Sequence, residues 1–464
     1  MNTSFSVVHI GLSRRQPLPA AMALALALSP TFSSAAQTVT NCNDSGSGSL
    51  RSALAAAVES DTINMTTLTC SKITLGTALV ISRNNLTLNG KGLQALTISG
   101  NNKTFGVLQH TGTGTLSVNN LSLTDGNYTS GGCIASLGNV ALVGVGMSYC
   151  TATGVGGKSV GGAVGAVHDV TVSSSVLRKN YATDTTSSGA VTVGGAIAGA
   201  DITISNSTIT NNSATTGGNI AGGGGVYAVG NLSISNTTLS NNIALDVGGL
   251  SSAGGGAFAG GNVTIVGSTF TINDASVGAG LAQGTVGKTV TVTNSTLSDN
   301  TGYLGGGMAI AGTLQLNNST VARNYVGGSY GAAGIEIGAN SVFQSSIVAN
   351  NTAPNASSFA DIGSKGVAVT VTGANNLVIT AQSSITLPGG TLKSDPMLAA
   401  FLESNGGPTQ TFKLMAGSPA IGTGNNVLRL PSDQRGPGFA RMTREKTDIG
   451  AYQTGDGIFA SGFE

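Results

Sequence analysis

Apolar and polar residues alternate in short stretches of this chain, and the same alternation returns many times. Asp201 to Ala214 reads DITISNSTITNNSA, Asn231 to Ala244 reads NLSISNTTLSNNIA, and Thr289 to Gly302 reads TVTVTNSTLSDNTG. In the first stretch Ile202 and Ile204 are two positions apart, which is the period of a β-strand with one buried face. The pattern predicts a series of short strands, with Asn at fixed places between them.

A short Gly-rich strand precedes each alternating strand, so each copy of the repeat contains three strands. These Gly-rich strands are GGCIAS (131–136), GGAVGA (161–166), GGAIAG (194–199), GGGVYA (223–228), GGGAFA (254–259) and GGGMAI (305–310). The copies recur every 24 to 32 residues, and the length varies in one loop. Repeats of this length stack on their neighbours into a solenoid. The sequence therefore predicts an all-β, single-stranded parallel β-helix of about eleven coils, roughly 50 Å long.

Asn and Asp residues recur at two places in the repeat. One column, before the alternating strand, contains Asn139, Asp169, Asp201, Asn231 and Asn262. The other, at the end of the copy, contains Asn180, Asn212, Asn242, Asn273, Asn300, Asn324 and Asn350, with weaker copies ending at Gly126 and Cys150. Asn and Asp tolerate left-handed backbone and bond nearby amides, and stacked Asn side chains form ladders. We interpret both columns as structural bends, with ligand binding as the alternative.

The two ends of the chain differ from the repeats. Arg14 and Arg15 precede the apolar run AAMALALAL, so residues 1–36 are expected to be an export signal cleaved after about Ala36. We expect an N-terminal cap at 37–72, with LRSALAAAV (50–58) as a short capping helix. The β-helix is assigned to 73–360, a C-terminal cap to 361–453 and a tail to 454–464. No later segment of the sequence is apolar for long enough to predict a transmembrane helix.

Each end of a solenoid exposes a sheet edge and an open core, so both caps are expected to cover an end. The expected helix would cover the first end and residues 395–453 the second. Asp433, Arg435, Arg441 and Asp448 are candidates for surface ion pairs that hold the second cap.

Four cysteines in an exported chain are expected to form disulfides. Four cysteines allow three pairings, and we favour Cys42 with Cys70 and Cys133 with Cys150 because these pairs are closest in the sequence. A metal site is disfavoured, since the spacings are not those of zinc motifs.

Both ends of the chain resemble known exported proteins. TVTNCNDSGSGSLRSALAAAVESDTINM (38–65) resembles the N-terminal cap of bacterial exported right-handed parallel β-helix proteins with repeats of the polymorphic outer-membrane type. NGGPTQTFKLMAGSPAIGTGN with DIGAYQ (405–453) resembles the choice-of-anchor Q domain, although this chain has Gly422 where family members tend to have Asp. The final GDGIFASGFE resembles a tail of exported proteins in xanthomonad-like bacteria. The resemblance implies a pectate-lyase-like, right-handed solenoid at the extracellular or outer-membrane surface of a Gram-negative bacterium.

The composition limits the classes of partner that the chain is expected to bind. Charged residues make up 8% of the chain and the formal net charge is +1; loss of Arg14 and Arg15 with the signal leaves 18 basic and 19 acidic residues. This balance gives no electrostatic case for nucleic-acid binding. Since the hydrophobic fraction is 40%, the chain is rich enough in apolar residues to form a core.

The sequence contains few candidate catalytic residues. His168 and Asp169, one coil from Asp201, are the best catalytic candidates, and two stacked carboxylates are able to share a proton or a Ca²⁺ ion. We nevertheless interpret both Asp residues as members of the bend column, and we expect no bound cofactor, with Ca²⁺ as the exception. The paired carboxylates and other motifs of polygalacturonase-like sites are absent from the sequence.

The variable loops are the remaining place for a function. Tyr128, Tyr181, Tyr303, Tyr325 and Tyr330 lie in or near them, and we favour loop packing over a binding stripe because the chain lacks Trp and has 4% aromatic residues. Our main hypothesis is a monomeric, non-enzymatic, adhesin-like interaction rod that binds a polysaccharide or another cell-surface ligand. The alternative is a carbohydrate-active protein, a lyase, glycosidase or lectin, acting on acidic polysaccharide.

Overall fold

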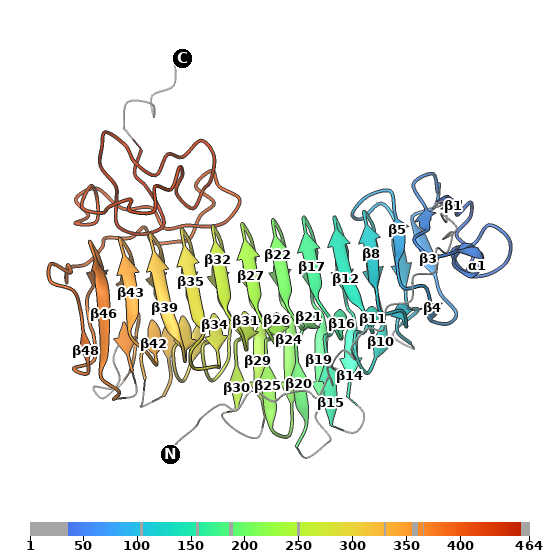
Figure 1. Cartoon of the computed structure of the whole chain (residues 1–464), viewed down its shortest axis with the longest axis horizontal. Coiled ribbons are helices and arrows are strands. Elements are labelled where there is room, and N and C mark those ends of the chain that lie inside the picture. Colours follow the sequence, from blue (N-terminus) through green and yellow to red (C-terminus); the bar gives the residue numbers. More distant parts are fainter. Residues whose placement is uncertain are drawn as a thin grey trace, which may run out of the picture.

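The computed structural model describes residues 36–102, 105–154, 157–184, 189–247, 251–328, 331–354, 361–364 and 366–455. These residues form a rod of stacked coils in which the named strands pair in parallel with the coils before and after (Figure 1). The predicted fold class is confirmed: the chain is an all-β, right-handed parallel β-helix. The predicted signal, apart from Ala36, and most of the predicted tail lie outside the described residues. No described helix is long and apolar enough to cross a membrane.

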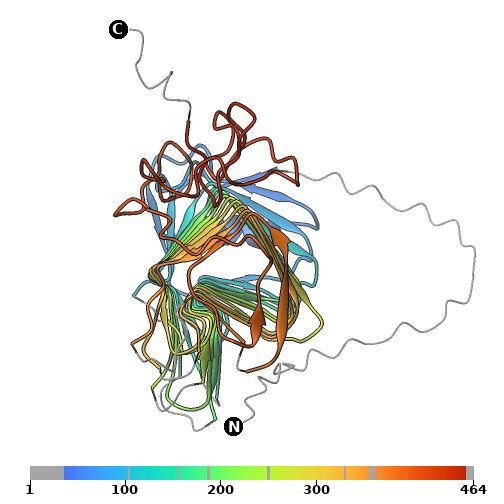
Figure 2. The same cartoon turned by 90° about the vertical axis from the view of Figure 1, so that its left-hand side faces the viewer.

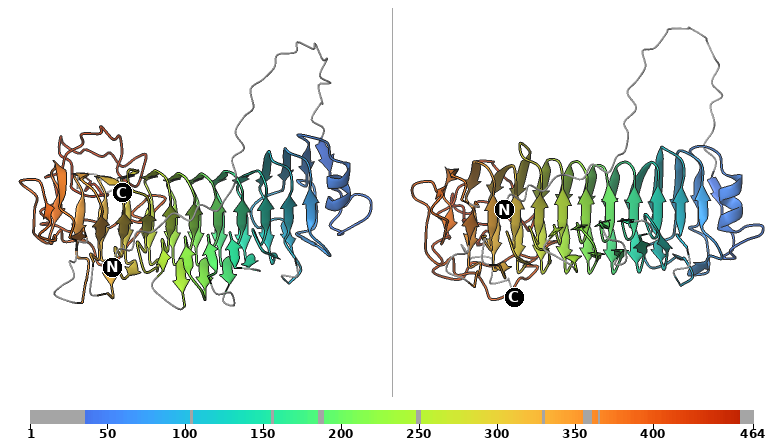
Figure 3. Two further views of the ribbon diagram at one scale, coloured as in Figure 1. Left: turned by 60° about the horizontal axis from the view of Figure 1, so that its bottom comes forward. Right: turned by 90° about the horizontal axis from the view of Figure 1, so that it is seen from below.

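Three long sheets, which we call A, B and C, run along the rod (Figure 3). Sheet A consists of β1 (Ala36–Thr38), β2 (Thr62–Asn64), β5 (Leu86–Asn89), β8 (Thr115–Asn119), β12 (Asn139–Val143), β17 (Val170–Ser173), β22 (Ile202–Ser205), β27 (Leu232–Ser235), β32 (Val263–Val266), β35 (Thr289–Thr293), β39 (Thr313–Asn317), β43 (Ser341–Gln344), β46 (Val369–Ala374) and β48 (Ile385–Thr386). Sheet B consists of β3 (Lys72–Thr74), β6 (Thr97–Ser99), β9 (Ser122–Thr124), β13 (Gly146–Ser148), β18 (Val176–Arg178), β23 (Thr208–Thr210), β28 (Thr238–Ser240), β33 (Thr269–Thr271), β36 (Thr296–Ser298), β40 (Thr320–Ala322), β44 (Ile347–Ala349) and β47 (Leu377–Val378). Sheet C consists of β4 (Leu79–Ile81), β7 (Leu108–His110), β11 (Ile134–Ser136), β16 (Val164–Ala166), β21 (Ile197–Gly199), β26 (Val226–Ala228), β31 (Ala257–Ala259), β34 (Leu281–Gln283), β38 (Met308–Ile310), β42 (Ile335–Ile337) and β45 (Ile362–Gly363).

Two additional sheets form a fin that projects from the middle coils. Sheet D consists of β10 (Asn127–Tyr128), β14 (Thr151–Thr153), β19 (Tyr181–Asp184), β24 (Ser213–Thr216) and β29 (Ile243–Asp246). Sheet E consists of β15 (Lys158–Val160), β20 (Val191–Val193), β25 (Ile220–Gly222) and β30 (Ser252–Ala253). A two-stranded sheet of β37 (Thr301–Gly302) and β41 (Tyr325–Val326) follows farther along. The variable loops of these coils are therefore strands, and each such coil has up to five strands instead of the three we predicted (Figure 2).

Apolar side chains of equivalent positions stack along the inside of the rod. Val170, Ile202, Leu232 and Val263 are in register on sheet A, and each is at most 1% exposed. Burial of an aliphatic side chain of this size contributes about 1.5–3 kcal/mol. The alternation in the sequence thus predicts the core correctly, because every second residue of a strand faces inward.

A buried ladder of asparagines stabilises the corner after sheet B. Each member accepts, at its Oδ1, hydrogen bonds from the backbone amide and the Nδ2 of the member in the preceding coil, at 2.8–3.1 Å. The members are Asn180, Asn212, Asn242, Asn273, Asn300, Asn324 and Asn351, and the series ends on the carboxylate of Asp361. Because every buried amide has a partner, the column avoids the cost of an unsatisfied polar group.

One residue of the predicted column is wrong: the last ladder member is Asn351 and not Asn350. Asn350 has a positive φ of 59° and is exposed, with its Nδ2 directed to Asp395. Asn211 and Asn212 have the same two roles: Asn211 has a φ of 56°, and Asn212 belongs to the ladder. In each Asn-Asn pair the first residue makes the left-handed turn and the second points inward.

A second buried ladder, which we did not predict, stabilises the corner between sheets A and B. Its hydroxyl groups accept from the backbone amide of the equivalent residue one coil earlier, at 3.0–3.2 Å. The members are Ser175, Ser207, Thr237, Ser268, Ser295, Ser319 and Ser346. They follow a left-handed residue such as Asn206, with a φ of 47°. The recurring N-S-T triplet is therefore a turn followed by a ladder residue.

The N-terminal end of the rod is covered as predicted. Helix α1 (Leu50–Ala56) begins at the N-cap Ser49, whose hydroxyl accepts from the Ser52 amide, and Leu50 joins the core. Disulfides join Cys42 to Cys70 and Cys133 to Cys150, the pairing we favoured.

The C-terminal segment does not cover the other end of the rod. Sheet A and sheet B continue beyond residue 360 to β48 and β47, and Ile385 still belongs to the core. Residues 395–453 lie along the side of the rod, above the later coils in Figure 1. Their contacts explain this position: Thr269 donates to the Gln410 carbonyl, Asn294 to the Ser432 carbonyl, and the Ala451 amide to Thr320.

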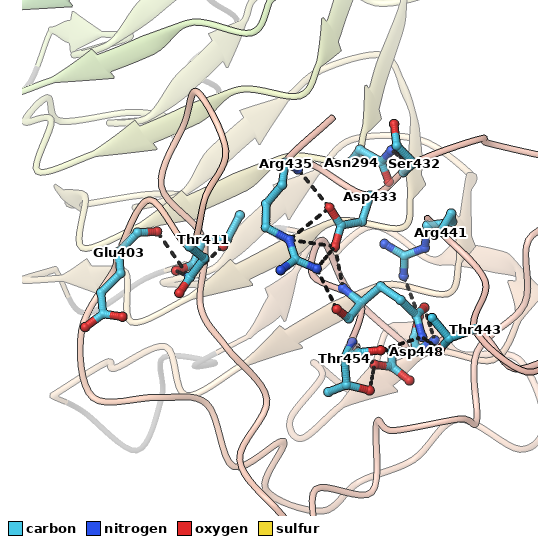
Figure 4. Close-up of polar contacts among 12 residues, drawn as sticks. Asn294, Glu403, Thr411, Ser432, Asp433, Arg435, Arg441, Thr443, Asp448 and Thr454 are labelled. Atoms are coloured by element: carbon cyan, nitrogen blue, oxygen red, sulfur yellow. Dashed lines mark hydrogen bonds and ion pairs between the residues drawn. The ribbon is translucent and has the colours of Figure 1, made fainter. Parts of the chain in front are cut away.

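Buried polar contacts hold this lateral segment together (Figure 4). Arg435 pairs with Asp433 at 2.6 Å, and its guanidinium lies 4.1 Å from the Phe439 ring centre and 4.0 Å from that of Tyr452. Arg441 is fully buried and donates to the Asp448 carbonyl; burial lowers the pKa of Arg441 to about 10. The expectation of surface ion pairs is therefore wrong, because Asp433 and Arg435 form a buried pair and Arg441 bonds a carbonyl.

Candidate binding groove

The outward face of sheet C carries one column of side chains along the rod. Its members, the second residue of each strand, are Val80, Gln109, Ala135, Gly165, Ala198, Tyr227, Phe258, Ala282, Ala309, Glu336 and Gly363. The column changes abruptly: two aromatic residues are followed by two alanines and then by a carboxylate. This change in size shapes the surface.

Sheet E of the fin covers the middle part of this column, whereas Val80, at its start, is 60% exposed. Val193, Ala198, Tyr227, Phe258 and neighbouring apolar residues form a buried cluster separate from the main core. The Tyr227 and Phe258 rings stack with centres 4.9 Å apart and planes 8° apart. Burial raises the pKa of Tyr227 to about 12, so its hydroxyl stays protonated in neutral solution.

The fin stops at β29 and β30, so its strands do not cover the later members of the column, of which Ala282, Ala309 and Glu336 are still at most 8% exposed. In the next coil the connection from the ladder to sheet C shrinks to residues 274–277, and Val277 bridges to Ala253 of β30. Ala282, the neighbour of Phe258 in the column, is too small to cover the ring. Phe258 is nevertheless only 8% exposed, so a small part of the aromatic stack is accessible.

A groove with a volume of about 300 Å³ begins beside Phe258. Its floor consists of Phe258, Ala282, Ala309 and Glu336, and its walls are Ala253, Val277 and Leu304 on one side and residues such as Val286 and Val367 on the other. Five successive coils contribute to it. Val286 and Val367 are 80% and 53% exposed at the rim.

Glu336 supplies the carboxylate among the residues that line the groove. Its side chain is 5% exposed, and its Oε2 accepts a hydrogen bond of 3.1 Å from the Ala332 amide. Gly363 follows it in the column, and a Cβ at that position would lie 2.7 Å from Oε2. The glycine thus makes room for the carboxylate at the far end of the groove.

Another hollow, of about 450 Å³, lies at the C-terminal end of the rod between Val378 and Lys393. Its walls come from a single stretch of chain, and they contain neither an aromatic ring nor a carboxylate. The lateral groove is the stronger candidate, since it combines residues from several coils.

The catalytic candidates lie elsewhere, at the exposed corner between sheets C and A. The Asp169 Oδ1 accepts from the Asp201 amide at 3.1 Å, and the Asp201 Oδ1 accepts from the Asn231 amide at 2.7 Å. Asn139 and Asn262 form the same contact with Asp169 and Thr289. His168 is exposed beside this ladder. The described residues contain no group of three His, Cys, Asp or Glu side chains placed to hold a metal ion.

The tyrosines divide between the fin and the region beyond it. Tyr128 and Tyr181 are on fin strands β10 and β19, whereas Tyr303 and Tyr325 are exposed near the groove wall at Leu304. Tyr330 lies outside the described residues.

The Gly-rich strands carry a sequence signal for the groove, although we did not predict a groove from it. Tyr227 and Phe258 are the aromatic residues within the quoted strands GGGVYA and GGGAFA, where the other quoted copies have small residues at that position. Glu336 is on β42.

Neither a protein-family model nor a curated protein matches the chain. Among solved structures, the chain is similar to the crystal structure of pectate lyase Pel9A, with 15% identical residues and a TM-score of 0.46. That match covers 92% of this chain and 98% of the other. We base the fold on the strand register of the chain itself, which identifies it as a parallel β-helix.

Proposed function

We propose that this chain is an exported β-helix that acts as a non-enzymatic interaction rod and binds its ligand in the lateral groove. The observation that carries the proposal is a largely apolar groove that five successive coils line and that Phe258 of the Tyr227–Phe258 stack borders at one end. Ligand sites are usually concave, largely apolar and about 300–1,000 Å³ in volume, with a few polar groups that orient the ligand. The groove has these properties.

Export and family membership belong to the same proposal. Two disulfides support export, because such bonds persist in oxidising compartments. The location we propose is the extracellular or outer-membrane surface of a Gram-negative bacterium. Membership of the choice-of-anchor Q and polymorphic outer-membrane-type group rests on the end motifs of the sequence, and we expect the protein to be a monomer.

The competing function is action on acidic polysaccharide through Asp169 and Asp201, with or without Ca²⁺. The hydrogen bonds of these carboxylates favour a structural role, since each accepts from the backbone of the next coil in the same way as Asn139 and Asn231 do. A shared contact along a column of Asn and Asp is what a corner ladder requires.

Binding and turnover distinguish the two functions. Purified residues 37–464 are applied to peptide and glycan arrays, and in parallel are incubated with polygalacturonate and alginate with and without Ca²⁺. We expect saturable binding that Ala282→Leu, which fills the groove, weakens at least about tenfold, and no turnover. Turnover that Asp169→Asn or Asp201→Asn abolishes, or binding that Ala282→Leu leaves unchanged, would refute the proposal.

A further inference from the structure

The lateral segment (395–453) binds the rod through a contact that recurs from coil to coil. In three of the coils that it contacts, the left-handed corner between sheets A and B is Asn294, Asn318 or Asn375, with φ values of 46°, 45° and 55°. The Nδ2 of each donates to a backbone carbonyl of the segment, at 2.8–3.1 Å. An asparagine at this corner therefore presents its side-chain amide to a polypeptide backbone wherever the segment covers it.

Gln434 of the segment binds two successive coils through its side chain. Its Oε1 accepts from the Thr296 hydroxyl at 2.6 Å, and its Nε2 donates to the Thr269 hydroxyl at 2.9 Å. These two threonines are the first residues of β36 and β33 and are in register. Two residues before Gln434, the Ser432 carbonyl accepts from the Nδ2 of Asn294. A corner asparagine and two stacked threonines thus hold a stretch of three residues, Ser432 to Gln434.

The same three positions recur in the coils that precede the lateral segment. Asn236 is the corner residue, with a φ of 46°, and Thr238 and Thr208 are the first residues of β28 and β23. Thr238 is in register with Thr208 on one side and with Thr269 on the other. Asn236 is exposed and the first two threonines are partly exposed, and Figure 1 shows that the segment leaves the coils of β22 and β17 uncovered. Among the described residues, the side chains of Asn236, Thr238 and Thr208 have no hydrogen-bond partner, and we call these three residues the free site.

The free site is limited on both sides. In the preceding coil Val176 takes the place of the threonine, and its side chain is unable to form a hydrogen bond. In the following coil the Thr269 hydroxyl already donates to the Gln410 carbonyl at 2.7 Å. Neighbouring strands are about 4.8 Å apart, so two coils span ~10 Å, which is the length of about three residues of extended chain. The free site therefore fits a stretch as long as Ser432 to Gln434.

The chemistry of the free site favours an uncharged polypeptide segment. Its side chains are neutral, and a charge buried against them would have no partner and would be costly. The corner amide is a donor that matches a backbone carbonyl, and two hydroxyls at strand spacing match a glutamine side chain, which has both a donor and an acceptor. Sugar hydroxyls match the same groups, but the equivalent groups of the occupied coils bind polypeptide.

We propose that the free site binds a loop of a partner protein in which a glutamine lies two residues after the residue whose carbonyl is bound. Asn236 binds that carbonyl, and the glutamine side chain bridges Thr238 and Thr208. The partner is a different protein and not a second copy of this chain, because the copy's own stretch of this kind, Ser432 to Gln434, already binds its own rod. The free site is on sheet B and the groove is on sheet C, so this interaction goes beyond the proposed function and does not depend on it.

The test uses residues 37–464 and the synthetic peptide acetyl-Gly-Ser-Ala-Gln-Gly-amide. Binding is measured by ligand-observed NMR, because a contact of a few hydrogen bonds is expected to have a Kd of about 1 mM. A peptide with leucine in place of the glutamine loses both contacts to the threonines, so we expect it to bind at least about tenfold more weakly. A peptide in which the glutamine is moved by one residue is expected to bind as weakly as the leucine peptide.

Protein variants assign the contacts. The double variant Thr208→Val/Thr238→Val removes both hydroxyls and keeps the β-branched shape, so it should weaken the glutamine peptide at least about tenfold and leave the leucine peptide unchanged. Asn236→Asp removes the amide donor at a turn that Asp also tolerates, and it should weaken both peptides about fivefold. Two variants are matched controls without effect: Thr171→Val, at an exposed residue of sheet A, and Asn120→Asp, at an exposed left-handed residue of the same corner.

Three outcomes would overturn the inference: no binding of the glutamine peptide, equal binding of the leucine peptide, or binding that the variants of the free site leave unchanged. If a glycan array instead shows binding that Thr208→Val/Thr238→Val abolishes, and no peptide binds, the assignment to a polypeptide is wrong. Ala282→Leu, in the groove, should leave the glutamine peptide unchanged. The groove is judged on ligands that the variants of the free site do not affect, so each proposal is able to fail while the other stands.

Discussion

At the scale of single residues, neighbouring asparagines have different roles at the corner after sheet B. Asn351 is buried, and its Oδ1 accepts both the amide and the Nδ2 of Asn324. Asn351→Ala removes this acceptor and leaves the buried backbone amide of Asn324 unsatisfied, while the Asn324 Nδ2 keeps the carbonyls of Leu297 and Ala322. We therefore expect a loss of about 1–3 kcal/mol in the free energy of unfolding. Asn350→Gly keeps the left-handed turn and is expected to change the free energy of unfolding by less than about 0.5 kcal/mol. Urea unfolding of both variants measures the difference; equal losses would contradict the ladder assignment.

The burial of Tyr227 is expected to affect the stability of the protein at alkaline pH. Burial raises its pKa to about 12, above the ordinary value of 10.0. The contribution of the neutral phenol to stability is therefore fully present below pH 10 and is lost as the pH rises toward 12. Between pH 8 and pH 11, the free energy of unfolding of the wild type should fall by about 1.4 kcal/mol more than that of Tyr227→Phe.

Chemical unfolding of both proteins at the two pH values measures this change. Tyr303→Phe, at an exposed tyrosine, is the control and should behave as the wild type. An alkaline loss that is the same in all three proteins would mean that Tyr227 ionises as a solvated tyrosine does.

The limits of sequence-based prediction are visible at this scale. Inward residues such as Ile202 and Ile204 are predictable because alternation has a period that only a strand satisfies. The choice between Asn350 and Asn351 is not, since both tolerate a left-handed turn and only the register decides which side chain points inward. Phe258 and Ala282 are 24 residues apart in the sequence, and their contact follows only from the pairing of β31 with β34.

At the scale of elements, the turns that lead into the strands of sheet C from β11 to β38 depend on a left-handed glycine. Gly254 has a φ of +68°, and a Cβ there would lie 2.3 Å from the Ala257 carbonyl oxygen. Gly254→Ala is therefore expected to lower the free energy of unfolding by more than about 3 kcal/mol, from left-handed strain plus a clash with backbone. Gly287 has a φ of +78° with open space around it, so Gly287→Ala is expected to cost only about 1–2 kcal/mol. Thermal unfolding of both variants tests this order, and similar losses would exclude the clash.

The fin is the element that the sequence predicts least well. Strands such as β24 and β29 occur where we predicted loops, because their residues do not repeat one alternation from coil to coil. Parallel stacking supplies the missing order: Ala214 and Ala244 are in register, although Thr215 is next to Leu245. Once neighbouring coils fix the backbone, a short segment forms a strand whether or not its own residues favour one.

At the scale of the whole molecule, the C-terminal segment packs on the later coils of the rod, so the two halves of the rod have different contacts. The sequence motif marks a separate region but does not predict its position, because the residues that bind it are spread over the coils from Gly267 to Asn375. Our prediction of an end cap considered only the exposed edge. The lateral position shows that the polar face of sheet B competes successfully for the same segment.

This asymmetry predicts a local loss of protection when the lateral contact is weakened. Gln434 is buried, donates to Thr269 and Thr409, and accepts from Thr296 at 2.6 Å. Gln434→Ala leaves the Thr296 hydroxyl without its acceptor, at a cost of about 1–3 kcal/mol where it stays buried. The Thr269 and Thr409 hydroxyls lose one donor each but still donate to the carbonyls of Gln410 and Gly267. Each coil of a solenoid contacts only its neighbours, so the effect should stay near β33 and β36.

Hydrogen exchange read by mass spectrometry measures this distribution. We expect faster exchange in segments that contain 268–271, 295–298 and 407–411, and unchanged exchange in β5, β8 and β12 at the other end of the rod. Gln315→Ala is the matched control, because the Gln315 side chain is exposed and its Oε1 accepts a long hydrogen bond of 3.4 Å from Thr291. Faster exchange along the whole rod in Gln434→Ala would instead mean that the solenoid unfolds as one unit and that the lateral segment stabilises all of it equally.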